Sequence, residues 1–486
     1  MDADDTVKIE TIDLSRDQGN PNLYRALTYV IAATSIFVFM CVVYFSRLLR
    51  PAVDDYCFAI DSNLGFIGGV SYWWENLNGY AFFIAGSIAT VGLPLLHLPW
   101  SFASALPFIL AAVCISLVVL QIFWAMPDQT KGSQRRFILL VSIPLFAITW
   151  WTYLWLPIAW GETGINKSIA LGLTHFQSLN GSYVISTCVV TGLVILTWNL
   201  TNRKSSRYSY LALIPGLIGG FSGIMMTLTI VVSCFLALAY ALTTKTLKEK
   251  GQRSYLVMLS ISSLAAGAIA NLAPGSLSRA EGLSSSAGLS PFSVAQSLSR
   301  TFPDSLRDAV DAFTNPGSLG VLLIISTITW FLLQSGITFQ SQSALRYAAF
   351  FFGVALVASV VTRFSQNFAY YAYWHFTDVR IYAFLALSSF GVFLGVQLNR
   401  LDFRAMRVVE SGLLIISLAL VGGSLLKMGA SIIERHARWE IGPAPISDIV
   451  VDIEDSTGFP NQCWEKLKEL RDHPSRSGDF SMPNVS

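Results

Sequence analysis

Long apolar stretches recur along the whole chain and constrain its fold more than any other feature. Nine stretches of about 16 to 24 mostly apolar residues lie at 26–46, 102–125, 137–157, 183–200, 255–272, 318–337, 347–362, 381–398 and 408–427. A helix needs about 20 apolar residues to cross a bilayer. Only 13% of the 486 residues are charged, whereas soluble domains average about 25%. The sequence therefore predicts an all-α polytopic membrane protein.

A further apolar region, 210–243, is too long for a single span. Its 34 residues would form a helix of about 51 Å, against a hydrocarbon core of about 30 Å. Basic residues flank it on both sides: Arg203, Lys204, Arg207, then Lys245, Lys248, Lys250 and Arg253. Because basic loops stay in the cytoplasm, an even number of crossings must separate them. The glycine-rich run 219–223 is the predicted turn, near the outer face, and about 11 spans result.

This topology places the N-terminus in the cytoplasm and the C-terminus outside. Of the 32 lysines and arginines, 17 fall in the predicted inner segments, eight in the outer loops and seven after residue 426, as the positive-inside rule requires. Residues 1–24 are polar and rich in aspartate, so they form a cytoplasmic tail and not a signal peptide. Residues 25–430 form the transmembrane domain, and 431–486 form a small extracytoplasmic segment.

The predicted outer segments are much longer than the inner ones. They cover 47–101, 158–182, 273–317, 363–380 and the C-terminal segment, so we expect function at the outer face. A net charge of +2 is no basic excess and gives no reason to expect a nucleic-acid partner. The six cysteines form no CxxC pair, which argues against a zinc site. Cys57 and Cys463 both fall in outer segments, where a disulfide between them can form.

Two adjacent acids, Asp54 and Asp55, follow the first span by a few residues. Neighbouring carboxylates need a cation, a basic partner or a catalytic use, and ionisable groups at a membrane boundary are usually functional. We therefore expect one of these uses for the pair. The structural alternative is that Asp54 caps a helix and Asp55 pairs with Arg50.

The segment 66–83 is partly apolar and contains Tyr72, Trp73, Trp74 and Glu75, which is typical of a helix lying in the membrane interface. Its tryptophans can stack on sugar rings or belong to an ordinary aromatic belt. The 158–182 segment carries polar groups that suit sugar hydroxyls: Glu162, Asn166, Lys167, His175, Gln177 and Asn180.

Three arginines lie at the predicted outer ends of spans: Arg279, Arg363 and Arg380. This position is unusual, because the positive-inside rule concentrates basic residues in cytoplasmic loops. Guanidinium groups bind phosphate oxygens bidentately, so phosphate binding explains their position. The alternative is that their side chains snorkel to the membrane surface.

Together these features resemble the polytopic glycosyltransferases of the GT-C class, which use a sugar linked to polyprenyl phosphate. The resemblance rests on the Asp54 and Asp55 pair after the first span and on the interfacial segment 64–83. The Asp-Asp-Tyr-Cys, Gly-Gly-x-Ser and Ala-Pro-Gly-x-x-x-Arg runs are similar to those of bacterial Gtr-like sugar transferases. The resemblance covers about residues 25–440. It departs from the family pattern at Ser276, which follows the Ala-Pro-Gly run where related chains have Asn.

The resemblance implies an inverting transferase of the bacterial inner membrane that moves a hexosyl or pentosyl group to an extracytoplasmic glycan or lipid-linked glycan. Asp54 or Asp55 would be the base, and the donor phosphate would bind to Arg279, Arg363, Arg380 and Lys167. The residues assigned to sugar or acceptor are Tyr56, Trp73, Trp74, Glu75, Glu162, His175, Tyr373 and His375. No cofactor is expected, and a divalent cation at the acidic pair is the less favoured alternative. A phosphate leaving group needs no protonation, so one base suffices, whereas glycosidases need two carboxyl groups.

Other functions stay open. An O-antigen ligase or polymerase also combines many spans with outer arginines, but it does not need an acidic pair so early in the chain. A transporter of lipid-linked sugars would carry charges in mid-membrane and internal repeats, and neither is evident in the sequence. A non-enzymatic scaffold would leave the acids and outer arginines without a purpose.

Overall fold

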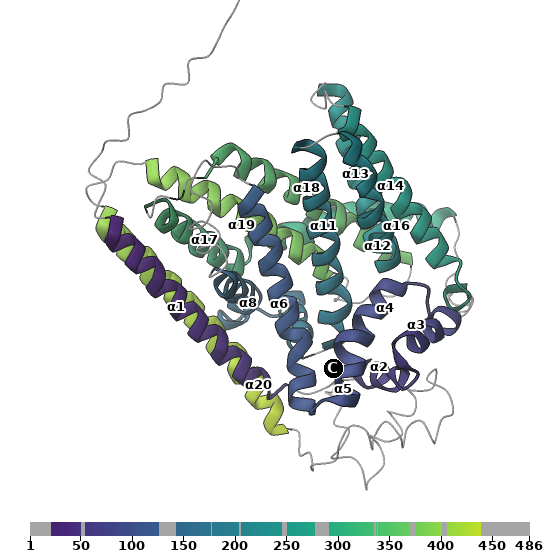
Figure 1. Ribbon diagram of the computed structural model, residues 1–486, viewed down its shortest axis with the longest axis horizontal. Coiled ribbons are helices and arrows are strands. Elements are labelled where there is room, and N and C mark those ends of the chain that lie inside the picture. The colour runs from purple at the N-terminus through teal and green to yellow at the C-terminus, as the bar shows by residue number, and fades with distance from the viewer. Residues whose placement is uncertain are drawn as a thin grey trace, which may run out of the picture.

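The computed structural model contains helices and no strand over the residues it describes (Figure 1). These residues are 21–49, 54–125, 142–175, 177–203, 206–244, 250–277, 291–334, 337, 339–368, 376–400 and 406–438. Within them, nine helices are long and apolar enough to cross a membrane. The chain is therefore an all-α polytopic membrane protein, as its apolar stretches predicted.

The long apolar helices coincide with the predicted stretches, with one exception. They are α1 (Pro21–Ser46), α6 (Trp100–Ala125), α11 (Ile185–Arg203), α13 (Ile224–Thr244), α14 (Lys250–Asn271), α17 (Pro316–Gln334), α18 (Ser341–Phe368), α19 (Thr377–Arg400) and α20 (Met406–Arg438). The exception is 137–157, where α8 (Ile143–Ala159) has only 17 residues. The span that contains α11 already begins at Gln177, because α10 (Gln177–Leu179) and the π-helix η2 (Asn180–Val184) lead into it.

The overlong region is broken within the glycine-rich run. A 3₁₀ helix, η3 (Ser206–Ala212), leads into α12 (Leu213–Ser222), and Gly223 separates α12 from α13 with φ 147°, a conformation that strains any residue but glycine. The 7 residues of η3 and 10 of α12 together rise about 29 Å, close to the thickness of the hydrocarbon core. The break is confirmed, and the total number of crossings stays a prediction.

Glycines bring α12 into direct contact with α14. A Cβ added at Gly216 would lie 1.9 Å from Ser262 Oγ, and one at Gly220 would lie 2.4 Å from Ala266 Cβ. Small residues let helices approach closely in lipid, where the gain comes from packing. Since both contacts advance together along the two helices, α12 and α14 run in the same direction.

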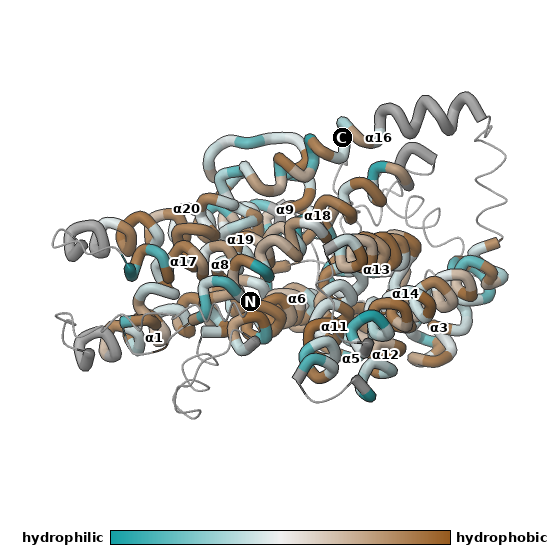
Figure 2. Tube along the Cα trace, turned by 90° about the horizontal axis from the view of Figure 1, so that it is seen from above, coloured by the Kyte–Doolittle hydropathy of each residue, from teal (hydrophilic) through white to brown (hydrophobic). Residues whose placement is uncertain are grey.

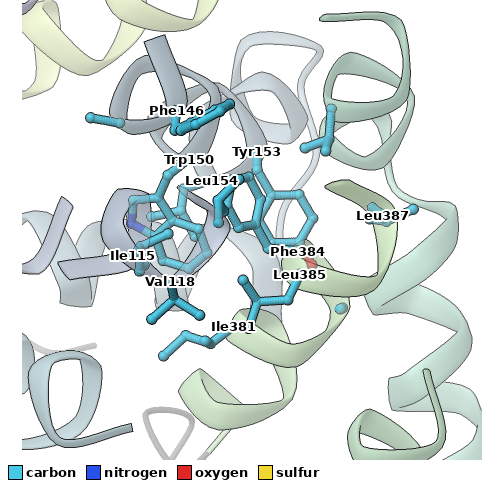
Figure 3. Packing of buried hydrophobic residues seen from close by; sticks show 14 of the residues in the cluster. Ile115, Val118, Phe146, Trp150, Tyr153, Leu154, Ile381, Phe384, Leu385 and Leu387 are labelled. Atoms are coloured by element: carbon cyan, nitrogen blue, oxygen red, sulfur yellow. The ribbon is translucent and has the colours of Figure 1, made fainter. Parts of the chain in front are cut away.

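α8 is the centre of the bundle. All its residues from Phe146 to Ile158 are buried, and α1, α6, α17 and α20 pack against it. Trp150 of α8 meets Phe384 of α19 edge-on, with ring centroids 5.2 Å apart, beside Ile115 of α6 (Figure 3). The neighbouring helices shield α8 from lipid, so its short length is tolerated.

The first and last helices lie at the periphery. Only 11% of the apolar window of α1 and 17% of that of α20 is buried. α8 lies between them in Figure 2. Their remaining surface is apolar and faces outward, as a lipid-facing helix requires.

Three segments predicted to lie outside between spans are largely helical, and in the first of them the sequence predicted an interfacial helix. Segment 47–101 contains α2 (Asp54–Ser62), α3 (Gly65–Asn76), α4 (Ala81–Ser87), the π-helix η1 (Ile88–Gly92) and α5 (Leu93–His97). Segment 158–182 contains α9 (Ile165–His175), and 273–317 contains the amphipathic α16 (Pro291–Thr314). The predicted interfacial segment is also split, because α3 ends at Asn76 and 81–97 forms one apolar helix. Backbone near lipid must pair its own polar groups, so long connections at a membrane fold into helices.

Side-chain hydrogen bonds join helix termini at one end of the bundle. Gln252 Nε2 donates to Asn202 Oδ1 at 3.1 Å, and Gln334 Nε2 donates to Asn399 Oδ1 at 2.6 Å. We call this the basic end, because the sequence-predicted cytoplasmic segments adjoin these four residues.

Other contacts define the opposite end, which we call the α2 end. Tyr80, which follows α3, donates to Asn271 Oδ1 at the end of α14 at 3.0 Å. His436 Nδ1 donates to the Leu48 carbonyl at 3.2 Å, which joins α20 to the end of α1. The predicted outer segments therefore gather at one end, as far as the structure describes them.

Candidate functional site

Asp55 anchors α2 at the α2 end. It is fully buried and accepts hydrogen bonds from the backbone N–H of Gln177 (3.3 Å) and Ser178 (2.7 Å). The first N–H groups of a helix lack partners within the helix and favour a negative charge. Asp55 therefore caps the span that contains α11. Its predicted partner Arg50 lies outside the described residues.

The other member of the acidic pair begins α2. Asp54 is the first residue of this helix. Its side chain and that of Tyr56 lie outside the described part of the structure. The structure thus assigns Asp55 a capping contact and does not describe a contact for Asp54.

Asp61 is a buried acid of α2 that no sequence pattern had marked. Trp73 Nε1 donates to Asp61 Oδ2, and the Trp73 ring stacks on Phe58 with centroids 5.0 Å apart. Asp61 Oδ1 is buried and has no hydrogen-bond partner. Burial raises the pKa of Asp61 from 3.8 to about 7, and the Trp73 hydrogen bond opposes this rise. Trp73 was predicted to stack on a sugar ring, and Phe58 occupies one face of its ring.

The neighbours of Trp73 connect α3 to the broken span. Trp74 is half-buried, and its ring lies 6.3 Å from that of Phe221, next to the α12–α13 break. Glu75 is exposed. The contact puts the junction of α12 and α13 at the α2 end, where the other predicted outer segments lie.

A second network of polar side chains joins α9, α16 and α19. Arg380 Nη2 donates to Asp311 Oδ2 at 2.5 Å. Asn166 Nδ2 donates to Asp311 Oδ1 at 3.3 Å and to Glu162 Oε2 at 2.9 Å. The Arg380 side chain is 5% exposed and that of Asp311 is 37% exposed, so this network reaches the surface through Asp311.

A second ion pair involves Asp308, about one helical turn before Asp311 on α16. Arg363 of α18 donates through Nε and Nη2 to both carboxylate oxygens of Asp308, with an Nη2–Oδ1 distance of 2.8 Å. The guanidinium carbon also lies 5.0 Å from the centre of the Phe376 ring, a cation–π arrangement. Asp308 and Asp311 are three residues apart and share one side of α16. One helix therefore holds two of the three predicted phosphate-binding arginines.

The remaining predicted residues are dispersed. Lys167 is exposed on α9. His175 is buried at the end of α9, with its Nε2 3.2 Å from Ser431 Oγ of α20. Arg279, Tyr373 and His375 lie outside the described residues.

The sequence interpretation missed the acids that hold the arginines. Asp308 and Asp311 fall in a segment assigned to a loop by its length. Small or polar residues at Thr301, Ser305 and Ala312, which are all buried, repeat with helical spacing in the same segment. This periodicity was the signal that could have located α16.

The structure also describes the cysteines and possible metal ligands in part. Cys57 is disulfide-bonded, whereas Cys41, Cys114, Cys188 and Cys234 are free thiols. Cys463 lies outside the described residues. Within the described residues, no group of three or more His, Cys, Asp or Glu side chains could hold a metal ion. Comparison of the chain with family models, curated proteins and solved structures finds no match.

Proposed function

We propose that the chain is an inverting glycosyltransferase that transfers a sugar from a polyprenyl-phosphate donor to an extracytoplasmic glycan. The observation that carries this proposal is the placement of Arg363 and Arg380 at the α2 end by a single helix, α16. This is the end at which α2 begins with its acidic pair. The enzyme would lie in a bacterial inner membrane with the α2 end outward.

Asp54 is the general base of this proposal. Asp55 is already engaged by two backbone N–H groups, so its carboxylate has a structural use. Asp54 precedes it by one position, and neighbouring helix positions do not share a face. The acceptor hydroxyl would attack the anomeric carbon, pass its proton to Asp54 and displace the phosphate, which inverts the anomeric centre.

The arginines supply the charge that a leaving phosphate needs. A guanidinium has five N–H donors, and Arg380 uses Nη2 for Asp311. The carboxylate orients the guanidinium, and other donors serve the phosphate. Because charge builds up on the phosphate oxygens as the sugar bond breaks, these contacts would strengthen in the transition state.

Transfer from a synthetic polyprenyl-phosphate sugar tests this proposal. Asp54→Asn is expected to lower the rate by about 10² to 10⁴ without changing thermal stability. Asp55→Asn is the matched variant: it removes the same charge one residue away. It should lower the free energy of unfolding by about 1 kcal/mol, because the amide loses the negative charge at the helix N-terminus and one of the two acceptor oxygens.

Two outcomes would overturn the proposal. Asp54→Asn could retain more than about a tenth of the wild-type rate, outside the range for a lost general base. Equal use of a nucleotide sugar would reject the donor class.

A further inference from the structure

The C-terminal half of α16 has three distinct faces. Its buried face packs on the bundle through Thr301, Ser305, Asp308, Ala309 and Ala312. Its polar exposed face carries Asp304, Arg307 and Thr314. A third face is apolar yet exposed: Phe302 is 67% exposed, and Leu306 and Val310 are each 49% exposed. Positions four residues apart form one stripe along a helix.

This apolar stripe continues onto a helix that qualifies as a span. Phe313 follows Phe302 by three helical turns and so belongs to the same stripe. Its ring packs against that of Phe352 on α18, with centroids 4.9 Å apart. Phe352 is 45% exposed and lies in the apolar window of α18. The stripe and the lipid-facing side of α18 therefore form one surface.

We infer that the stripe of Phe302, Leu306 and Val310 is a docking surface for the acyl chains of the bilayer. A helix with one side on the protein, one polar side and one apolar side lies at the boundary between membrane and water. Contiguous exposed apolar side chains are unfavourable in water, and the surface they continue already belongs to the membrane. The inference does not depend on the proposed function.

The docking has a consequence for the two ion pairs. The same helix carries Asp308 and Asp311, which bind Arg363 and Arg380. The depth of α16 in the bilayer then sets the depth of both guanidinium groups. α16 would form the wall between lipid and the polar group around Arg380.

Spin labelling of the full chain in lipid nanodiscs tests this inference. The four free cysteines are replaced by alanine, Cys57 is retained, and single cysteines are introduced as Phe302→Cys, Leu306→Cys and Val310→Cys. Asp304→Cys and Arg307→Cys on the polar face of α16 are the matched controls. Labels on the stripe should collide with oxygen, which concentrates in lipid, and hardly with a water-soluble nickel chelate. Their oxygen-to-nickel collision ratio should be several-fold higher than that of the controls.

Two results would overturn the inference. Similar ratios at all five positions would mean that the stripe faces water. Spin–spin broadening between labels, together with low accessibility to both reagents, would mean that a second copy of the chain covers it. If the cysteine replacements disturb folding, reaction of the same five variants with a water-soluble maleimide in the otherwise unchanged chain gives the same distinction, since the stripe positions should then react slowest.

Discussion

Two buried acids on α2 have different surroundings. Asp55 faces the N-terminus of a spanning helix and accepts from two backbone N–H groups. Asp61 receives one hydrogen bond, from Trp73, and its second oxygen has no partner. An unpartnered buried oxygen is costly when it carries charge. The free energy of folding therefore depends on the protonation of Asp61.

Asp61 should make stability fall as the pH rises. Its pKa is about 7 in the folded chain against 3.8 as the ordinary value, so the folded state binds the extra proton between these values. Within this window the free energy of unfolding should decrease with rising pH, by at most about 1.4 kcal/mol per pH unit. The contribution is constant from about one pH unit below 3.8 downward and from about one pH unit above 7 upward. Thermal unfolding in detergent across this range measures it.

Asp61→Asn is the control for this pH dependence. The amide does not titrate, so the variant should lose the slope assigned to Asp61 and be relatively more stable than the wild type above pH 7. An unchanged slope would show that another group is responsible.

The sequence marked the acidic pair of α2 but not what each acid does. An acidic pair beside a membrane suggests function whatever its partners are. The partner of Asp55 lies 122 residues away in the chain, so no local pattern could identify the cap. Asp61 looked like an ordinary polar position of a short helix, because its burial arises from α3 folding back onto α2.

At the scale of elements, α16 joins α18 and α19 through its acids. Asp308 and Arg363 should show an interaction energy of about 1.5 to 3 kcal/mol in a double-mutant cycle, because their hydrogen bonds are charge-assisted and partly buried. The cycle compares Asp308→Asn, Arg363→Gln and the double variant by thermal unfolding. Asp304→Asn removes the same charge from the exposed face of α16 and should leave stability within about 0.5 kcal/mol. Additive single effects would mean that the ion pair adds nothing.

The contact between α12 and α14 depends on glycine. Gly220→Val should destabilise the chain by about 1 to 3 kcal/mol, because its Cβ would lie 2.6 Å from the Ser263 carbonyl oxygen. Gly353→Val on α18 is the matched control, since nothing lies within 4 Å of a Cβ there. Thermal unfolding of the two variants measures the difference. Equal stability would show that α12 and α14 can separate at no cost.

The sequence predicted helices and helix breaks where one sequence feature, such as a long apolar run, dominates the segment. Runs of apolar residues located the nine long helices of the described residues, although one further run, 137–157, holds only the 17-residue α8. The glycine-rich run located the break at Gly223. In 47–101 the sequence predicted one interfacial helix, at 66–83, but not the separate helices α2, α3 and 81–97. Segment length alone failed for 273–317, which contains the amphipathic α16. The hydrophobic periodicity of α16 was readable, but its partners on α18 and α19 follow only from the tertiary fold.

At the scale of the molecule, the bundle has a basic end and an α2 end. The basic end should face the cytoplasm. Arg207→Cys and Arg253→Cys should react with an impermeant maleimide only after cells are permeabilised. Asn63→Cys at the α2 end should react in intact cells. Labelling of either basic-end variant from outside would contradict the predicted orientation.

The position of α8 also fixes the order in which the molecule can be completed during synthesis. The neighbours of α8 come from both ends of the chain: α1 and α6 precede it, whereas α17 and α20 follow. At the usual pace of translation, α20 is made on the order of tens of seconds after α8. During that interval the side of α8 that packs against α20 in the finished molecule has no helix on it. A chain that stops before Met406 would keep that side permanently open.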